Sequence, residues 1–229
     1  MHQTIEPAIL YFGTPVVLIA TLNEDGSPNL APMSSAFWLG WRCMLGLAAG
    51  SKTTQNLLRS GECVLNLPSV AEADAVDRLA LTTGCDPVPA YKAGRGYVHV
   101  KDKFGRAGFT PVPSQTVAPP RVRECPVQME AVLAGTHGVA ADDPRLAGHI
   151  VALEVRVQRV HAAPHILDAE RPDHVDPDRW RPLIMSFQKL YGLAPGPLRP
   201  STLARIPEAS YRSPDVDRAR TARACSAGA

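Results

Sequence analysis

Short stretches rich in β-branched and apolar residues dominate the first two-thirds of the chain. In the clearest, residues 149–161, valine and leucine alternate with charged and amide side chains, which is the pattern of a strand with one buried face. Asp-Gly at 25–26 and Asp-Pro at 143–144 supply turn chemistry between such segments. The predicted strands are 16–21, 27–39, 42–47, 63–67, 127–133 and 149–161. About six strands with small helical insertions favour an antiparallel β-barrel.

Helical spacing is predicted in two segments before residue 165. The first, 55–59, ends at Gly61, a typical helix stop before a return to sheet. The second, 69–81, opens with Ser69 and an acidic first turn, and its apolar residues recur on one side. We therefore expect one amphipathic helix over 69–81. Its carboxylates, Glu72, Asp74 and Asp77, are interpreted as a solvated face.

The Gly-Ser-Lys-Thr-Thr sequence that precedes the first helix has the chemistry of an anion site. A turn of this kind presents unpaired backbone N–H groups, hydroxyls and an ammonium to one small volume, at the positive end of the helix dipole. An ordinary helix N-cap is the simpler interpretation, because Ser and Thr are preferred caps whatever they bind. The Walker spacing GxxxxGK[ST] is absent.

Several segments, taken in order, are similar to one protein family. They are Asn29 to Ser35, Gly50 to Leu57, Gly61 to Leu67, Phe109 to Ser114, Pro119 to Val122, Glu124 to Glu130 and Gly148 to Val151. This set resembles the flavin reductase-like, FMN-binding split-barrel family, which includes the flavoredoxins. The resemblance implies a mainly β fold: an antiparallel split β-barrel of Greek-key type with a few short helices.

The resemblance also implies where a flavin would lie. It assigns the isoalloxazine and ribityl to Asn29, Ala31, Pro32, Met33, Ser34 and Ser35, and the phosphate to Ser51, Lys52, Thr53 and Thr54. His149, at the start of the last strand, is the catalytic candidate, placed near the flavin's reactive edge or the nicotinamide. A strand-end histidine bonded to backbone remains the alternative for His149. The segment 82–108 adds a local basic density, which faces a cofactor phosphate or a nicotinamide dinucleotide, or is plain surface: Lys92, Arg95, Lys101, Lys103 and Arg106.

The expected activity is that of an NAD(P)H-dependent flavin reductase. In this interpretation FMN is bound, NADH or NADPH visits as hydride donor, and the acceptor is free flavin, a partner oxygenase or another acceptor. The resemblance implies a homodimer with the flavin at the subunit boundary. A flavoredoxin-like electron carrier, a flavoenzyme with its own small-molecule substrate and a non-enzymatic FMN-binding module remain alternatives. Neither GxSxG nor the Rossmann GxGxxG occurs.

Composition limits the possible partners of the protein and the compartment in which we expect it. A formal net charge of +2 over 229 residues disfavours nucleic acid as a partner. Five scattered cysteines, no signal peptide and no apolar run long enough to span a bilayer predict a reduced, cytoplasmic protein. No cysteine or carboxylate completes a ligand set around the C-terminal histidines, so no metal site is expected. We expect one domain over 1–207, with 170–207 as an extended segment and 208–229 as a disordered tail.

Overall fold

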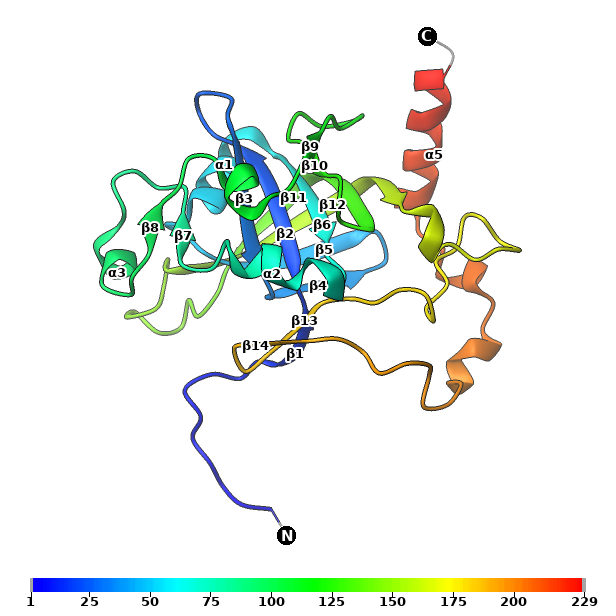
Figure 1. The fold of residues 1–229 in the computed structure, drawn as a ribbon, viewed down its shortest axis with the longest axis horizontal. Helices are drawn as coiled ribbons and strands as arrows, with labels where there is room; N and C mark the ends of the chain where they lie inside the picture. The colour runs from blue at the N-terminus through cyan, green and yellow to red at the C-terminus, as the bar shows by residue number, and fades with distance from the viewer. Residues whose placement is uncertain (1, 228–229) are drawn as a thin grey trace.

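A seven-stranded antiparallel sheet forms the centre of the molecule (Figure 1). The computed structural model describes the backbone of residues 2–227 and the side chains of residues 2–222. The strand order in the sheet is β3 (Pro28–Met33), β2 (Val17–Leu22), β6 (Glu62–Leu67), β11 (Val127–Gly138), β12 (Ile150–Ala162), β5 (Arg42–Ala48) and β4 (Ala36–Leu39). The mainly β, antiparallel fold predicted from the sequence is thus confirmed.

The sheet curls because consecutive strands occupy its two opposite edges. β3 lies at one edge and β4 at the other, yet only Ser34 and Ser35 separate them in the chain. Two residues span roughly 7 Å at most, so the edges must approach one another. At this corner the backbone amide of Gly46, on β5, donates to the carbonyl of Ser35 across 2.8 Å. The predicted segment 27–39 is therefore two strands joined at the barrel's corner.

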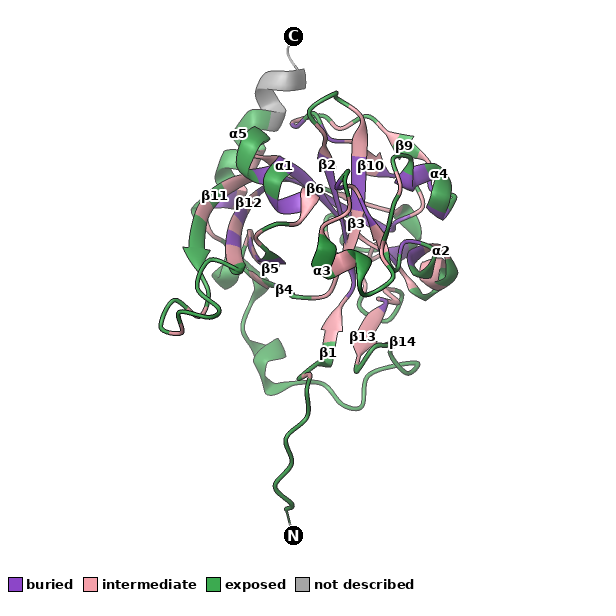
Figure 2. Ribbon diagram, turned by 90° about the vertical axis from the view of Figure 1, so that its left-hand side faces the viewer, coloured by how far each residue is buried: buried purple, intermediate pink, exposed green. Residues whose placement is uncertain are grey.

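Around β2, both faces of the sheet are buried, by different partners. On β2, Val17 and Ile19 point into the apolar interior, whereas Leu18 and Ala20 pack under the segments that cover the outside. The outer layer comprises α2 (Ala73–Asp77), α4 (Lys103–Ala107) and the segment from Phe109 to Cys125. The burial colours of Figure 2 follow this arrangement, with purple concentrated on the central strands. Continuous apolar runs such as 16–20 arise because neither face meets water.

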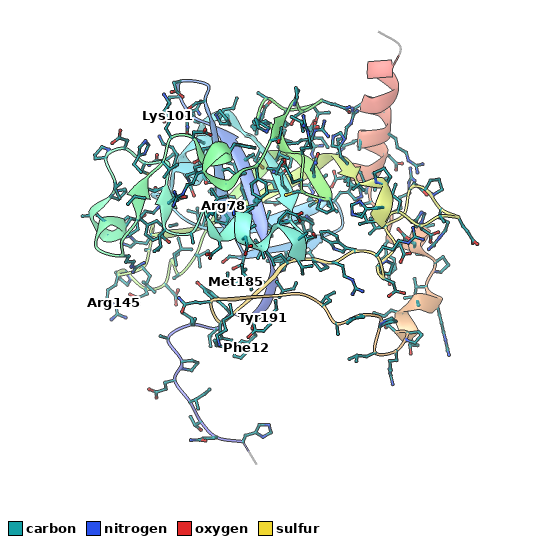
Figure 3. The ribbon with its side chains drawn as sticks, viewed as in Figure 1. Phe12, Arg78, Lys101, Arg145, Met185 and Tyr191 are labelled. Carbon is teal, nitrogen blue, oxygen red and sulfur yellow. The ribbon has the colours of Figure 1, made fainter. Side chains whose placement is uncertain are left out.

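Smaller elements extend the barrel. Antiparallel strands β1 (Phe12–Pro15), β13 (Ile184–Ser186) and β14 (Lys189–Tyr191) form a three-stranded sheet, and Figure 3 shows Phe12, Met185 and Tyr191 grouped there. The rings of Phe12 and Phe187 meet edge-to-face at 4.8 Å. The remaining short elements are β7 (Thr82–Thr83), α3 (Ala90–Ala93), β8 (Val98–His99), β9 (Pro111–Val112) and β10 (Arg121–Val122), besides helix α1.

The single helix predicted over 69–81 is wrong in its extent. A 3₁₀ turn, η1 (Val70–Glu72), leads into α2, which ends at Asp77. Glu72 is not part of a solvated face, because its carboxylate accepts from the backbone amide of Ser69 across 2.7 Å and completes a capping box. Leu81 takes a left-handed φ of 53°, which ends the helical path.

Residues 208–227 also differ from the predicted disordered tail. They form a 3₁₀ turn, η4 (Glu208–Tyr211), and a helix, α5 (Pro214–Ala227). Asp215 is 7% exposed and holds this helix to the barrel through Arg42. This region has no apolar period because the contact that docks it is ionic. No helix in the described part of the chain is long and apolar enough to cross a membrane.

Candidate functional site

The N-terminus of α1 (Lys52–Ser60) lies at the end of β5. Ser51 caps the helix: its hydroxyl accepts from the amide of Thr54 across 3.2 Å. The Thr54 hydroxyl donates in turn to the carbonyl of Ala48 across 2.9 Å. Two predicted phosphate ligands, Ser51 and Thr54, therefore shape the turn with their side chains. The amides of Lys52 and Thr53 lie in the first turn, where no intrahelical acceptor exists, and are available to an anion.

Asn29 connects this helix to the sheet. Its amide nitrogen lies 3.3 Å from the hydroxyl oxygens of both Thr21 and Thr53, and all three side chains are buried. The amide oxygen of Asn29 is buried without a donor among the described residues. Gly84 lies against it, since a Cβ at that position would come 2.6 Å from this oxygen and 3.0 Å from Cγ of Lys52. Only glycine allows this close approach of the 83–86 segment.

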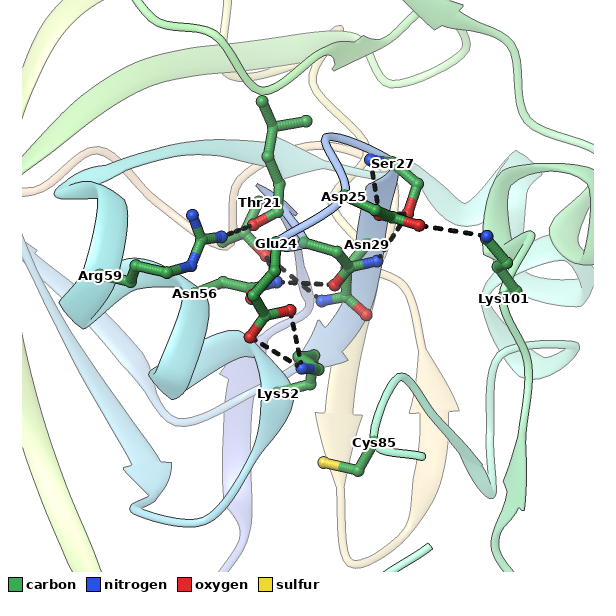
Figure 4. Close-up of polar contacts among 12 residues, drawn as sticks. Thr21, Glu24, Asp25, Ser27, Asn29, Lys52, Asn56, Arg59, Cys85 and Lys101 are labelled. Atoms are coloured by element: carbon green, nitrogen blue, oxygen red, sulfur yellow. Dashed lines mark hydrogen bonds and ion pairs between the residues drawn. The ribbon is translucent and has the colours of Figure 1, made fainter. Parts of the chain in front are cut away.

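Lys52 has a carboxylate partner in the structure. Its ammonium lies 3.1 and 3.2 Å from the two carboxylate oxygens of Glu24 (Figure 4). A hydrogen bond with its own backbone and another from Lys52 lower the pKa of Glu24. The side chain of Glu24 is 60% exposed and that of Lys52 only 17%. Glu24 can therefore swing into solvent and leave Lys52 in place for another anion.

Lys103 is the most informative charge near the site. It begins α4 and is only 3% exposed. No hydrogen bond or ion pair joins its ammonium to a side chain among the residues described. Burial, and next the charge of Lys92, lower its pKa from 10.5 to about 8. A buried, unpaired ammonium is costly unless a counter-ion is present, so this location favours an anion.

Lys103 is linked to α1 only indirectly, because the charges of Lys92 and Cys85 act on it and Cys85 contacts the turn before α1. The Cys85 thiol lies 3.8 Å from the carbonyl of Gly50, the residue before the helix cap. Lys92 approaches the hydroxyl of Thr83 at 3.4 Å. Of the five basic residues noted in the sequence, Lys92 and Lys103 thus turn inward, whereas Arg95, Lys101 and Arg106 are exposed. The feature of the sequence that could have indicated the burial of Lys103 is its position between Asp102, which caps α4, and the buried Phe104.

The residues expected to hold the ring lie on β3 and at the barrel corner. Ala31 and Pro32 pair with Ile19 and Leu18 of β2, and Met33 pairs with Val17. Ser34 and Ser35 form the link to β4, and Ser35 is exposed. Their position at a sheet edge leaves one side of this backbone free of ladder hydrogen bonds.

His149 is brought to the same end of the barrel by its backbone. Its carbonyl accepts from the amide of Ala49 across 2.9 Å, and its amide donates to Leu146. Ala49 lies between β5 and the cap of α1. The side chain of His149 is exposed, so it stands near the α1 end of the barrel without a buried structural role.

Comparison with known proteins identifies the family. The family model described as "Flavin reductase like domain" matches residues 9–190. The chain belongs to the flavin reductase-like family. A curated relative, the uncharacterized protein YdfE of Bacillus subtilis (strain 168), is 38% identical over 191 residues, which cover 83% of this chain and 89% of YdfE.

Solved structures of flavin reductase-like proteins share the fold. Flavoredoxin of Desulfovibrio vulgaris (Miyazaki F) superposes with a TM-score of 0.69 at 20% identity, covering 89% of this chain and all of that one. Nitrilotriacetate monooxygenase component B from Bacillus cereus gives 0.66 at 19% identity, covering 86% and 98%. A protein from Shewanella frigidimarina NCIMB 400 that is described as having a split barrel domain gives a TM-score of 0.63 at 15% identity, covering 83% of this chain and 87% of that one. The split-barrel prediction is confirmed.

The α1 end of the barrel fits the phosphate of a flavin nucleotide. The orphaned oxygen of Asn29 lies there as an acceptor, which suits a hydroxyl of the ligand rather than a phosphate dianion. The donors are the free first-turn amides and the ammonium group of Lys52, with Lys103 close enough to Cys85 and Lys92 for their charges to act on it. This donor set is predominantly cationic and is close to the edge of β3. In a flavin reductase-like protein, these residues would hold the cofactor, and the flavin would supply the redox chemistry.

Proposed function

We propose that this protein is an FMN-binding, NAD(P)H-dependent flavin reductase. The observation that carries the proposal is Lys103, a buried ammonium without a carboxylate partner among the described residues. The charge of Cys85, which contacts the turn before α1, acts on Lys103. A phosphate dianion would neutralise the ammonium of Lys103 and would accept from the free amides of the helix. FMN presents such a dianion at the end of its ribityl chain, whereas riboflavin does not.

Each proposed contact has a defined source in the fold. Lys52, Lys103 and the amides of Lys52 and Thr53 would bind phosphate, while the hydroxyls of Ser51 and Thr54 keep the turn in shape. Asn29, with Ala31 to Ser35, would hold ribityl and ring at the edge of β3. His149 would assist the binding of the nicotinamide donor from its exposed position. A bound flavin would accept hydride, so none of these residues need act as a nucleophile.

The assembly and partners are proposed on the same basis. We place the flavin at the boundary of a homodimer, with free flavin or a partner oxygenase as acceptor. A structural neighbour is named as component B of nitrilotriacetate monooxygenase, which supports an oxygenase partner. Cys43, Cys63, Cys85 and Cys125 are buried, free thiols, consistent with a reducing compartment such as the cytoplasm.

A flavoredoxin-like electron carrier is the second candidate, supported by the structural match to flavoredoxin. Anaerobic titration of the purified protein, loaded with FMN, separates the two. Rapid bleaching of the flavin absorbance by NADH or NADPH is expected for a reductase. Bleaching only by a reduced protein or dithionite would favour the carrier. A protein that binds no FMN would contradict both.

A further inference from the structure

A cavity lies between the barrel and the C-terminal arm, which we define as residues 207–222, away from α1. Its volume is about 830 Å³, within the range of small-molecule sites. The floor is formed by the end of β12 and by Trp41, in the turn between β4 and β5. The wall is formed by the loop 167–175 and by the arm, whose helix α5 stands beside the barrel in Figure 1.

Apolar side chains face this hollow without being covered. Val160, Val175 and Tyr211 line it and are 42%, 41% and 59% exposed. With the indole of Trp41 they form walls suited to a flat apolar body. Such surfaces gathered in one concavity are typical of a binding site rather than of ordinary surface.

The charges of the lining leave positive groups unpaired. Both carboxylates of the cavity, Asp173 and Glu208, contact the imidazole of His174, at 2.6 and 3.1 Å. Arg159 donates through Nη1 to the amide oxygen of Gln115, while its Nη2 is buried without an acceptor. Arg220 lies within 4 Å of no carboxylate oxygen among the described side chains, but its charge acts on Asp173 of the same lining. A ligand therefore meets available cations and already engaged carboxylates.

The arm is held over the cavity by ionic contacts. Asp215 binds Arg42 across 3.0 Å, and Glu208 binds His174. Asp215 is the one buried residue among the described side chains of the arm. The arm lies beyond residues 9–190, which match the family. One wall of the cavity is thus built by a segment outside the matched domain.

We propose that this cavity binds a small aromatic or alicyclic carboxylate. The ring would lie against Trp41 and Tyr211, and the carboxylate would meet Arg220 at the arm. β5 separates this site from the flavin site, because its seven residues run from beside Trp41 to the turn before α1, roughly 20 Å. The site is therefore distinct from the proposed reductase centre.

Calorimetric titration with 1-naphthoate tests the proposal in the full-length protein saturated with FMN. We expect saturable one-to-one binding, weakened ~10-fold or more for 1-naphthalenemethanol, which has the same ring and no charge. Arg220→Gln should weaken naphthoate binding similarly while leaving FMN binding unchanged. Ala219→Phe, which fills the cavity from α5, should abolish it. Arg199→Gln, an exposed arginine outside the lining, is the matched control and should bind normally.

The contrary results are equally defined. The proposal would be overturned if the wild type showed no saturable naphthoate binding. It would also be overturned if Arg220→Gln and Ala219→Phe bound naphthoate as tightly as the wild type does. Loss of naphthoate binding in Lys103→Gln with retention in Arg220→Gln would overturn it too, because that would place the ligand in the flavin site. Circular dichroism and thermal melting of each variant confirm that lost binding is not lost folding.

Discussion

The guanidinium of Arg42 donates to the carboxylate of Asp215 across 3.0 Å and joins β5 to the first turn of α5, 173 positions later in the chain. The same guanidinium contacts Glu154 on β12 at 2.6 Å. Hydrogen bonds from Arg42 to Glu154 and Asp215 raise the pKa of the arginine, so the contact persists across ordinary pH. One cation thus fixes the C-terminal arm to the barrel.

We expect Arg42→Gln to release the arm. Asp215 is buried and would keep only Arg218 as a cationic partner, at a cost of about 1–3 kcal/mol. Hydrogen–deuterium exchange should accelerate in residues 207–222 while the sheet remains protected. Arg145→Gln, which removes an exposed pair with Asp143, is the control and should have little effect. Unchanged exchange in the arm would contradict this role of Arg42.

FMN affinity should fall as the pH rises through about 8. The pKa of Lys103 is about 8 before the ligand binds, and an anion binds the protonated form. At pH 9 the affinity should be ~10-fold lower than the low-pH limit. Fluorescence titration with FMN at pH 6.5 to 9.5 measures the dependence. Riboflavin, which lacks the phosphate, and the variant Lys103→Gln should both give flat profiles.

The lowered pKa of Lys103 also makes the free energy of unfolding depend on pH. Between pH 8 and 10.5 the unfolded chain retains a proton on Lys103 that the folded protein has released. The contribution of Lys103 to the free energy of unfolding therefore increases with pH in this window. Urea denaturation of the wild type and of Lys103→Met at pH 7.5 and 9.5 checks this dependence. The difference in the free energy of unfolding between the two proteins should be smaller at pH 9.5 than at pH 7.5.

Glu24 and Lys52 should have opposite effects on FMN binding. Lys52→Ala together with Thr53→Ala should weaken binding by about 2–4 kcal/mol, through lost charge-assisted hydrogen bonds and a disturbed first turn. Glu24→Gln should strengthen binding, because it removes the carboxylate that occupies Lys52. Equilibrium dialysis with FMN tests both. Undiminished flavin retention in the double variant would count against the phosphate site.

His149→Ala should slow reduction by the nicotinamide without releasing the flavin. The side chain is exposed beside the turn that leads into α1, and its backbone makes the structural contacts there. Stopped-flow measurement of flavin bleaching gives the rate, and flavin fluorescence gives retention. His165→Ala, at a distant 3₁₀ turn, is the control. An unchanged reduction rate would remove His149 from the site.

Glu130 should be a determinant of acid stability. It is fully buried and accepts from His161 at 2.7 Å and from the amides of Gln115 and Thr116. Burial opposes its ionisation, but these hydrogen bonds outweigh it and hold its pKa at about 2. Its stabilisation is present above pH 4.5 and is lost as the pH falls towards 2.

Replacement of Glu130 tests that link. Glu130→Gln should lower the free energy of unfolding by about 2–4 kcal/mol at pH 7 and should free the loop 113–121 for proteolysis. The effect should diminish as the pH approaches 2. Glu62→Gln, whose partly exposed carboxylate accepts from Ala118 in the same loop, serves as a milder comparison.

The sequence by itself determined most strands of the central sheet, the helix cap and the family. Apolar alternation marked β12, Gly61 ended α1 with its left-handed φ of 72°, and Ser51 capped the helix because capping depends on adjacent residues alone. These are local properties, so a local pattern reveals them.

Tertiary structure alone decided which charged residues are buried and which of them form long-range ion pairs. Lys103 and Lys101 look alike in the sequence, yet one is buried without a carboxylate partner among the described residues and the other pairs with Asp25 in solvent. Likewise, residues 208–222 have no apolar period, but Arg42 and Asp215 dock them. Burial and long-range ion pairs arise from contacts between distant segments, and the energy of a charge depends on those surroundings rather than on its neighbours in the chain.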